Sequence, residues 1–264
     1  MTVNKLKKML LALLLVTACA LLIVACGSDE PATPVGKVVK GPVSGADVYD
    51  ANGVLVGTTN ANGNFPMTGT APYHTGNVVG SGNLGTYLPI LVDGTLGAAQ
   101  SAPPLQGYGS SSQITPLTTI VATNPALATT FVTLGIDLNA DLSTRTTQNT
   151  AAFTLLETIG AALSATHSLS PTNYAQVIAA IATSLAAELP ATPALFNQMA
   201  PGAISTAVIT TITANLPALL VAIPTLATDI SNAATGAAIL PIPGSGSTGS
   251  TGGTGGTGGT GSGF

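Results

Sequence analysis

The chain has 264 residues, of which 45% are hydrophobic and only 6% are charged, while 39 are threonine. This balance excludes disorder of the whole chain, because disorder pairs low hydrophobicity with high charge. The six Lys and Arg residues, three of them in the first eight positions, argue against an electrostatic nucleic-acid interface, which needs clustered basic side chains.

The first 25 residues have the layout of a secretion signal. Lys5, Lys7 and Lys8 precede an uncharged apolar run, residues 9–25. The run is nearly long enough to cross a bilayer as a helix, so an uncleaved anchor is the alternative interpretation. Its end favours cleavage, because residues 23–26 (Ile-Val-Ala-Cys) resemble the bacterial lipobox, in which a small residue precedes an invariant Cys.

The lipobox resemblance implies that the Cys26 thiol receives a diacylglycerol, that the signal is cut before Cys26, and that the new amino terminus is acylated. Residues 16–19 (Val-Thr-Ala-Cys) are a weaker candidate, because a cut before Cys19 would leave an apolar stub on the mature chain. Gly27, rather than Asp, follows Cys26. By a sorting rule that varies between bacteria, this implies the outer membrane.

The mature chain, residues 26–264, would carry three basic and ten acidic side chains, a formal charge of -7 (three minus ten). Lipid phosphates would repel such a chain, so its attachment to the membrane would depend on acyl chains, which hold firmly only when several act together. Both cysteines lie in the signal and lipobox, so no disulfide is expected in the mature protein.

A linker, residues 26–34, leads to a small β domain predicted over residues 35–105. Its start is rich in β-branched side chains punctuated by Gly and Pro. Asn52-Gly53 is a strong hairpin signal, because both central residues of a type I′ turn need positive φ. Asn62-Gly63 marks a second turn. The remaining strands are expected at 78–79, 87–92 and 95–96.

About thirty residues of this domain resemble the carboxypeptidase regulatory-like, or transthyretin-like, β-sandwich. The family's pattern joins a Gly-x-Val strand, a Gly-Pro-Val-x-Gly-Ala step, a Val-Tyr-Asp strand, an Asn-Gly turn and a segment ending in Asn-Gly-x-Phe. The resemblance implies a small antiparallel sandwich that serves as a non-catalytic module for structure or binding. The matching residues here are 36–38, 41–46, 48–50, 52–53 and 59–65.

Residues 80–85 fit the nucleotide-binding pattern G-x-G-x-x-G. A dinucleotide site requires a helix to begin there, with its N-terminus facing the pyrophosphate. Residues 86–92 instead read as a strand with Pro89 near its centre, and no acidic residue follows at about twenty positions. The pattern therefore predicts a glycine turn.

The second half, residues 114–240, is predicted to be an Ala/Thr-rich helical domain, after a linker at 106–113. Residues 114–119 (Ile-Thr-Pro-Leu-Thr-Thr) resemble a segment that follows transthyretin-like domains in some bacterial surface lipoproteins, with no known chemistry. Residues 189–228 carry no charge, but Thr, Asn and Pro interrupt the run, which favours bundle helices over membrane contact.

The Gly/Ser/Thr repeat at 241–264 predicts a flexible tail, or the chain is truncated there.

Local signals place the helix boundaries. Thr115 before Pro116, and Ser170 before Pro171, are N-cap signals, and Pro190 ends the second of these helices. Helices are predicted over 115–124, 125–135, 151–166, 171–189, 193–200, 203–215 and 217–234.

The sequence holds one weak calcium candidate. Asp137, Asn139 and Asp141 have the spacing of the first three ligands of a calcium loop. The loop should have Gly at position 6 and Glu at position 12, but Leu142 and Gln148 stand there. Helix capping or a polar loop is therefore the preferred interpretation, and we expect neither a metal nor a cofactor.

No catalytic motif is evident in the sequence. The two histidines, His74 and His167, have no Cys, His, Asp or Glu within three residues, and no G-x-S-x-G segment occurs. A Ser-His-Asp triad assembled in space is the enzymatic alternative, since triads are defined by geometry.

These patterns predict an α+β protein: a β-sandwich, then a helical bundle. The predicted function is a non-catalytic lipoprotein held to the outer membrane through Cys26, with a structural or binding role toward a protein or polymer of the envelope. One alternative is an envelope hydrolase with a cluster of acid, His and Ser around His74 or His167. Another is an accessory protein for export or envelope assembly, which would expose an apolar patch on its helices.

Overall fold

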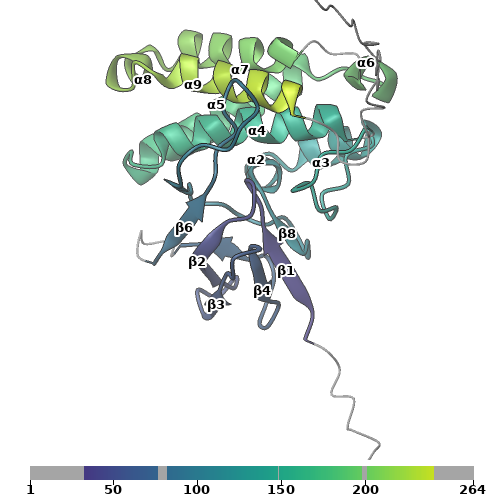
Figure 1. Cartoon of the computed structure of the whole chain (residues 1–264), viewed down its shortest axis with the longest axis vertical. Coiled ribbons are helices and arrows are strands. Elements are labelled where there is room, and N and C mark those ends of the chain that lie inside the picture. Colours follow the sequence, from purple (N-terminus) through teal and green to yellow (C-terminus); the bar gives the residue numbers. More distant parts are fainter. Residues whose placement is uncertain (1–32, 77–81, 148, 198–200, 241–264) are drawn as a thin grey trace, which may run out of the picture. The chain divides into compact units, whose positions relative to one another are not determined.

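Strands precede helices along the described part of the chain, which comprises residues 33–76, 82–147, 149–197 and 201–240 of a computed structural model (Figure 1). The fold is α+β, as predicted. The strands are β1 (Val35–Val38), β2 (Ser44–Tyr49), β3 (Leu55–Thr58), β4 (Asn64–Pro66), β5 (His74–Thr75), β6 (Leu84–Tyr87), β7 (Gln100–Ser101) and β8 (Gln113–Ile114). The helices are α2 (Pro116–Thr123), α3 (Ala126–Thr133), α4 (Thr150–Thr166), α5 (Pro171–Glu188), α6 (Pro193–Asn197), α7 (Pro201–Asn215), α8 (Pro217–Ala222) and α9 (Leu226–Ile239).

The strands form two small sheets. One has the order β4-β1-β8, with β4 antiparallel and β8 parallel to β1. The other has the order β3-β2-β6-β7, all antiparallel, and β5 also pairs with β2. The step between β1 and β2 therefore carries the chain from one sheet to the other.

The predicted hairpin at Asn52-Gly53 is present between β2 and β3, but its turn begins earlier than a type I′ turn would. The Gly53 N–H donates to the Asp50 carbonyl at 2.9 Å, and Gly53 has φ 75°. The Asp50 carboxylate accepts the N–H groups of Asn52 and Val54, both at 2.9 Å, and of Thr70 at 3.2 Å. These hydrogen bonds, the one from Val54 foremost, lower the pKa of Asp50.

The glycine-rich segment continues into a strand. Residues 84–87 form β6, so no helix begins where a dinucleotide site would need one. The predicted strand at 87–92 is shorter than expected, since β6 ends at Tyr87 and only a bridge between Ile90 and Leu96 follows. Pro89, which has no N–H to donate, interrupts the ladder. The strand expected at 78–79 lies outside the described residues.

The segment predicted as a linker, 106–113, packs between the strands and the helices. Its last residue begins β8, and Ser111 and Gln113 are buried. Two threonines of α2 hold its start: the Thr118 hydroxyl donates to the Gln106 carbonyl at 2.7 Å, and the Gln106 N–H donates to the Thr119 hydroxyl at 2.9 Å. The described residues from Val35 onward belong to one compact unit, and one hydrophobic cluster contains residues of both sheets and of the helices.

Both predicted N-caps are confirmed. The Ser170 hydroxyl accepts the Asn173 N–H at 3.3 Å. Thr115 and Thr118 form a reciprocal capping box: each hydroxyl accepts the other residue's N–H, at 3.0 and 2.8 Å. The helix predicted over 217–234 is wrong as one element, because it is broken into α8 and α9 before Pro224. A proline disfavours helical backbone at the preceding residue, and Ile223 has φ -129° and ψ 80°.

The capping box makes Thr115 important for stability. Thr115→Ala removes the acceptor for a buried N–H, and we expect a loss of about 2 kcal/mol in the free energy of unfolding. Thr133→Ala is the matched control, because that exposed hydroxyl only bonds to its own helix at Thr129. It should change stability by less than about 0.5 kcal/mol in the same denaturant titration. Equal effects of the two substitutions would contradict the cap assignment.

Helix α4 is the centre of the helical half. It contacts α2 and α5 as well as α7 and α9, and Figure 1 shows it between the sheets and the outer helices α7 and α9. Most of its residues are buried. Within the described residues, none of the helices has the length and apolarity needed to cross a membrane. The Gly/Ser/Thr tail at 241–264 lies outside the described residues.

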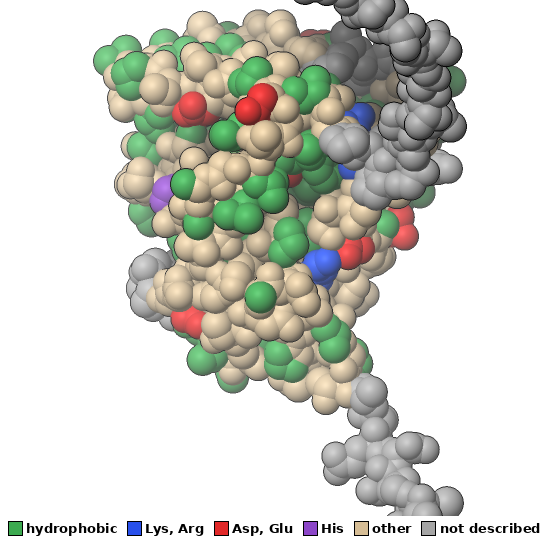
Figure 2. Space-filling view, in the orientation of Figure 1, with side chains coloured by type: hydrophobic (Ala, Val, Ile, Leu, Met, Phe, Trp, Pro, Cys, Tyr) green, Lys and Arg blue, Asp and Glu red, His purple; other side chains and the backbone are tan. Residues whose placement is uncertain are grey.

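Threonine supplies much of the polar surface of the helices. Figure 2 shows few charged side chains on the visible face. In many helical threonines the hydroxyl donates to the carbonyl four residues earlier, which satisfies it within its own helix. Such threonines outside the core are Thr123, Thr133, Thr150, Thr183, Thr206, Thr213 and Thr235. The buried Thr119, Thr154, Thr158 and Thr166 make the same hydrogen bond.

Candidate functional site

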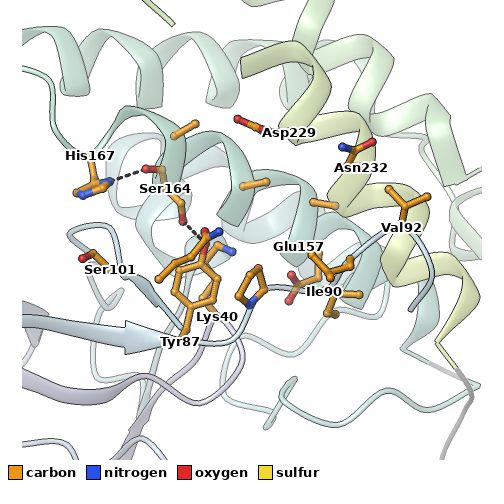
Figure 3. Close-up of a pocket in the computed structure, with 16 residues that line it drawn as sticks. Lys40, Tyr87, Ile90, Val92, Ser101, Glu157, Ser164, His167, Asp229 and Asn232 are labelled. Atoms are coloured by element: carbon orange, nitrogen blue, oxygen red, sulfur yellow. Dashed lines mark hydrogen bonds between the residues drawn. The ribbon is translucent and has the colours of Figure 1, made fainter. Parts of the chain in front are cut away.

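A cavity of about 480 Å³ lies between the strands and helices α4 and α9 (Figure 3). The end of β6 and the segment after it form one wall, and the two helices form the other. Polar side chains from four separate elements meet there, in contrast to the mostly apolar core. The ones that matter most are Lys40, Tyr87, Glu157, Ser164, His167 and Asp229.

Lys40 reaches the cavity from the turn between β1 and β2. A bridge between Val39 and Pro42 closes this turn, and Gly41 has φ 72°. Lys40 is only 2% exposed. Its stem lies against Gly160 of α4, where an added Cβ would lie 2.6 Å from the Lys40 Cε. A glycine at 160 therefore makes room for the buried lysine.

The aromatic ring of Tyr87 packs against the Lys40 ammonium. It is the last residue of β6, and strand alternation buries it together with Gly85. The Lys40 Nζ lies 3.7 Å from the centroid of the Tyr87 ring, a cation–π contact. The Tyr87 hydroxyl lies 3.1 Å from Gln100 Oε1 and 3.0 Å from Ser164 Oγ. Because an amide oxygen can only accept, Tyr87 donates to Gln100 and is free to accept from Ser164.

Glu157 brings the opposite charge into the cavity. It lies one turn before Gly160 on the same face of α4 and is 2% exposed. Burial raises the pKa of its carboxyl, and the charge on Lys40 offsets part of that rise. The two groups do not form an ion pair; within the described residues, only Lys37 and Asp141 do so, at 2.7 Å.

His167 and Ser164 lie at the other end of the cavity without forming a catalytic triad. His167 Nδ1 is 2.5 Å from the main-chain carbonyl of Ser164, so it contacts the backbone rather than the hydroxyl. Among the described residues, no carboxylate is hydrogen-bonded to His167. His74 lies elsewhere, stacked on Tyr49 with ring centroids 5.8 Å apart, and its Nδ1 is 2.7 Å from the Gly76 carbonyl.

The calcium candidate forms local turns. Asp137 accepts the Asn139 N–H at 2.8 Å, and Asp141 accepts the Ser143 N–H at 2.9 Å. Asp141 also pairs with Lys37. These contacts match the polar-loop interpretation. The described residues contain no group of three His, Cys, Asp or Glu side chains able to hold a metal ion, while Cys26 and Gln148 lie outside them.

Sequence reasoning missed Lys40, Glu157 and Ser164 as members of one site. A usable signal existed in α4, because Glu157, Gly160 and Ser164 recur at spacings of three and four residues and so share a helix face. Glu157 also interrupts an otherwise apolar stripe with a charge, and buried charges are rare. Comparisons of the chain with known protein families, with curated proteins and with solved structures give no match.

Proposed function

We propose that this protein is a non-catalytic lipoprotein, held to the outer membrane by lipid on Cys26, whose folded part is a binding module of the cell envelope. The lipobox at residues 23–26 carries this proposal. The position of the folded part supports it, because the compact unit begins at Val35, directly after the short polar segment 26–34. A lipid on Cys26 would therefore be joined to that unit by a short tether.

We further propose that the strands are a transthyretin-like sandwich, and that the helices form a bundle on it. The support is the way the residues of the sequence pattern pack on one another. A Cβ at Gly36, in the Gly-x-Val strand, would lie 2.4 Å from the Phe65 ring of the Asn-Gly-x-Phe segment. A Cβ at Gly63 would lie 2.5 Å from the Val38 carbonyl. At both Gly36 and Gly63, a side chain would therefore collide with another part of the same pattern, which explains why glycine stands there.

A binding role fits the cavity better than catalysis does. Its buried groups, Lys40 and Glu157, come from different elements and are held in place by packing, as ligand-contacting groups are. The arrangement of His167 and Ser164 offers no activated nucleophile, because the imidazole contacts a carbonyl.

The anchor is tested by replacing the two cysteines separately. With labelled palmitate, we expect wild type and Cys19→Ala to carry the label and to fractionate with the outer membrane. Cys26→Ala should lose the label, keep its signal and leave the outer-membrane fraction, because the acceptor thiol is gone. A Cys26→Ala protein that still carries the label in the outer membrane would contradict the proposal.

A further inference from the structure

The cavity contains a buried lysine and a buried glutamate, neither of which has an ion-pair or hydrogen-bond partner among the described residues. Lys40 and Glu157 are each 2% exposed, yet neither forms an ion pair or a side-chain hydrogen bond there. The Lys40 ammonium has three N–H donors, and among the described residues it lies against the Tyr87 ring without donating a hydrogen bond. Both side chains line the open space of the cavity (Figure 3).

Such an arrangement costs folding free energy. A buried charge is normally paired and hydrogen-bonded, because its loss of hydration is not otherwise compensated. The charge on Lys40 offsets only part of the burial cost of Glu157, and within the described residues no ion pair joins the two groups. A ligand in the cavity that brings an anionic group to Lys40 and a cationic group to Glu157 would compensate the rest of this cost.

We propose that the cavity binds a small zwitterion, a free amino acid or short peptide, with its carboxylate at Lys40 and its ammonium at Glu157 and Asp229. This deepens the proposed binding function and rests on it. Asp229 is exposed in the first turn of α9 and lines the same cavity, so it adds a second carboxylate on the side of the helices. Opposite charges fixed at separate points select a ligand that carries both.

The size and walls of the cavity limit the ligand further. A volume of about 480 Å³ lies within the range of small-molecule sites. Apolar side chains complete the walls, among them Ile90 after β6, Ala161 and Ala165 on α4, and Ala233 on α9. These short side chains suit small apolar substituents, such as those of alanine or leucine. Because Lys40 is already fixed in place, binding does not have to order it.

The test uses matched ligands and the full-length lipidated protein in detergent. Alanyl-alanine and free leucine are titrated and followed by calorimetry. N-acetyl-alanyl-alanine lacks the ammonium, and alanyl-alanine amide lacks the carboxylate. We expect alanyl-alanine to bind and each blocked form to bind at least about tenfold more weakly, because each leaves one buried charge unpaired. If neither zwitterion binds at about 10 mM, or if a blocked form binds equally well, the inference is wrong.

Two variants assign the ends of the ligand. Lys40→Met should weaken alanyl-alanine binding at least about tenfold, while Lys37→Met, which removes a lysine outside the cavity, should not change it. Asp229→Asn, at an exposed position, should weaken alanyl-alanine binding but leave binding of the N-acetyl form unchanged. An unchanged affinity for alanyl-alanine in both Lys40→Met and Asp229→Asn would overturn the assignment.

This result is separate from the test of the anchor. If the protein is labelled by palmitate but binds neither zwitterion, the lipoprotein proposal stands and only the ligand inference is wrong. If the protein binds alanyl-alanine but takes no label, the ligand inference stands and the proposed lipid anchor is wrong.

Discussion

Gly236→Ala should destabilise the protein by about 2–3 kcal/mol, as overpacking against rigid neighbours does. Gly236 lies in α9, where an added Cβ would be 2.2 Å from the Leu91 carbonyl oxygen and 2.8 Å from its carbon. These are backbone atoms and cannot rotate away, so α9 must move off the segment that follows β6. The better helix propensity of alanine offsets only about 1 kcal/mol. Urea unfolding of the purified protein measures the net effect.

The control for this substitution is Gly202→Ala in α7. Gly202 is also helical, but it is exposed and no described atom lies within 4 Å of an added Cβ. Stability should rise there by about 0.5 kcal/mol, through propensity alone. If the two alanine variants prove equally stable, the close contact between α9 and Leu91 does not exist. The cavity wall that these two elements form would then differ from the one described above.

Glu157→Gln should make the protein more stable at pH 8 than wild type, with the two equal near pH 4. The buried carboxyl has its pKa raised in the folded state. Its favourable contribution is therefore complete below the unfolded-state pKa, about 4.3, and is lost as pH rises through the folded-state value. Each unit of raised pKa corresponds to about 1.4 kcal/mol. Glutamine resembles the neutral acid at every pH, so the variant should lack this loss.

The measurement is urea unfolding at several pH values between 4 and 8, for wild type, Glu157→Gln and Glu188→Gln. Glu188 is an exposed carboxyl at the end of α5, and its variant should keep the slope of wild type. A Glu157→Gln protein that is less stable than wild type at pH 8 would mean that Lys40 stabilises the ionised carboxylate more than burial penalises it.

Local chemistry explains which elements could be predicted. Helices α2 and α5 each begin with a hydroxyl residue followed by a proline, Thr115 and Ser170 respectively. Each hydroxyl caps an N–H only three residues later, so a short stretch of sequence contains the whole signal. The break between α8 and α9 also had a local cause, in Pro224. It was missed because apolar periodicity continues across it, and periodicity alone does not show that the intervening backbone has left the helix.

The cavity could not be predicted in the same way, because its parts come from distant segments. Lys40 lies in a turn between strands, where a charge is normally exposed to solvent. Its burial depends on a missing side chain at Gly160, which the helical pattern counts as part of an apolar stripe. The predicted linker raises a similar problem. Its Ser- and Gly-rich composition does not reveal that threonines of α2 bind its backbone at Gln106.

The threonines of the helices give the surface more hydrogen-bond acceptors than donors. A hydroxyl that donates its hydrogen bond to a carbonyl of its own helix leaves only oxygen lone pairs and a methyl group facing outward. Exposed residues such as Thr133, Thr183 and Thr213 are of this kind. Their oxygens accept hydrogen bonds from water and from partners but donate few in return. A molecule that docks on them must bring its own N–H or O–H groups, so this almost uncharged surface favours partners rich in hydrogen-bond donors.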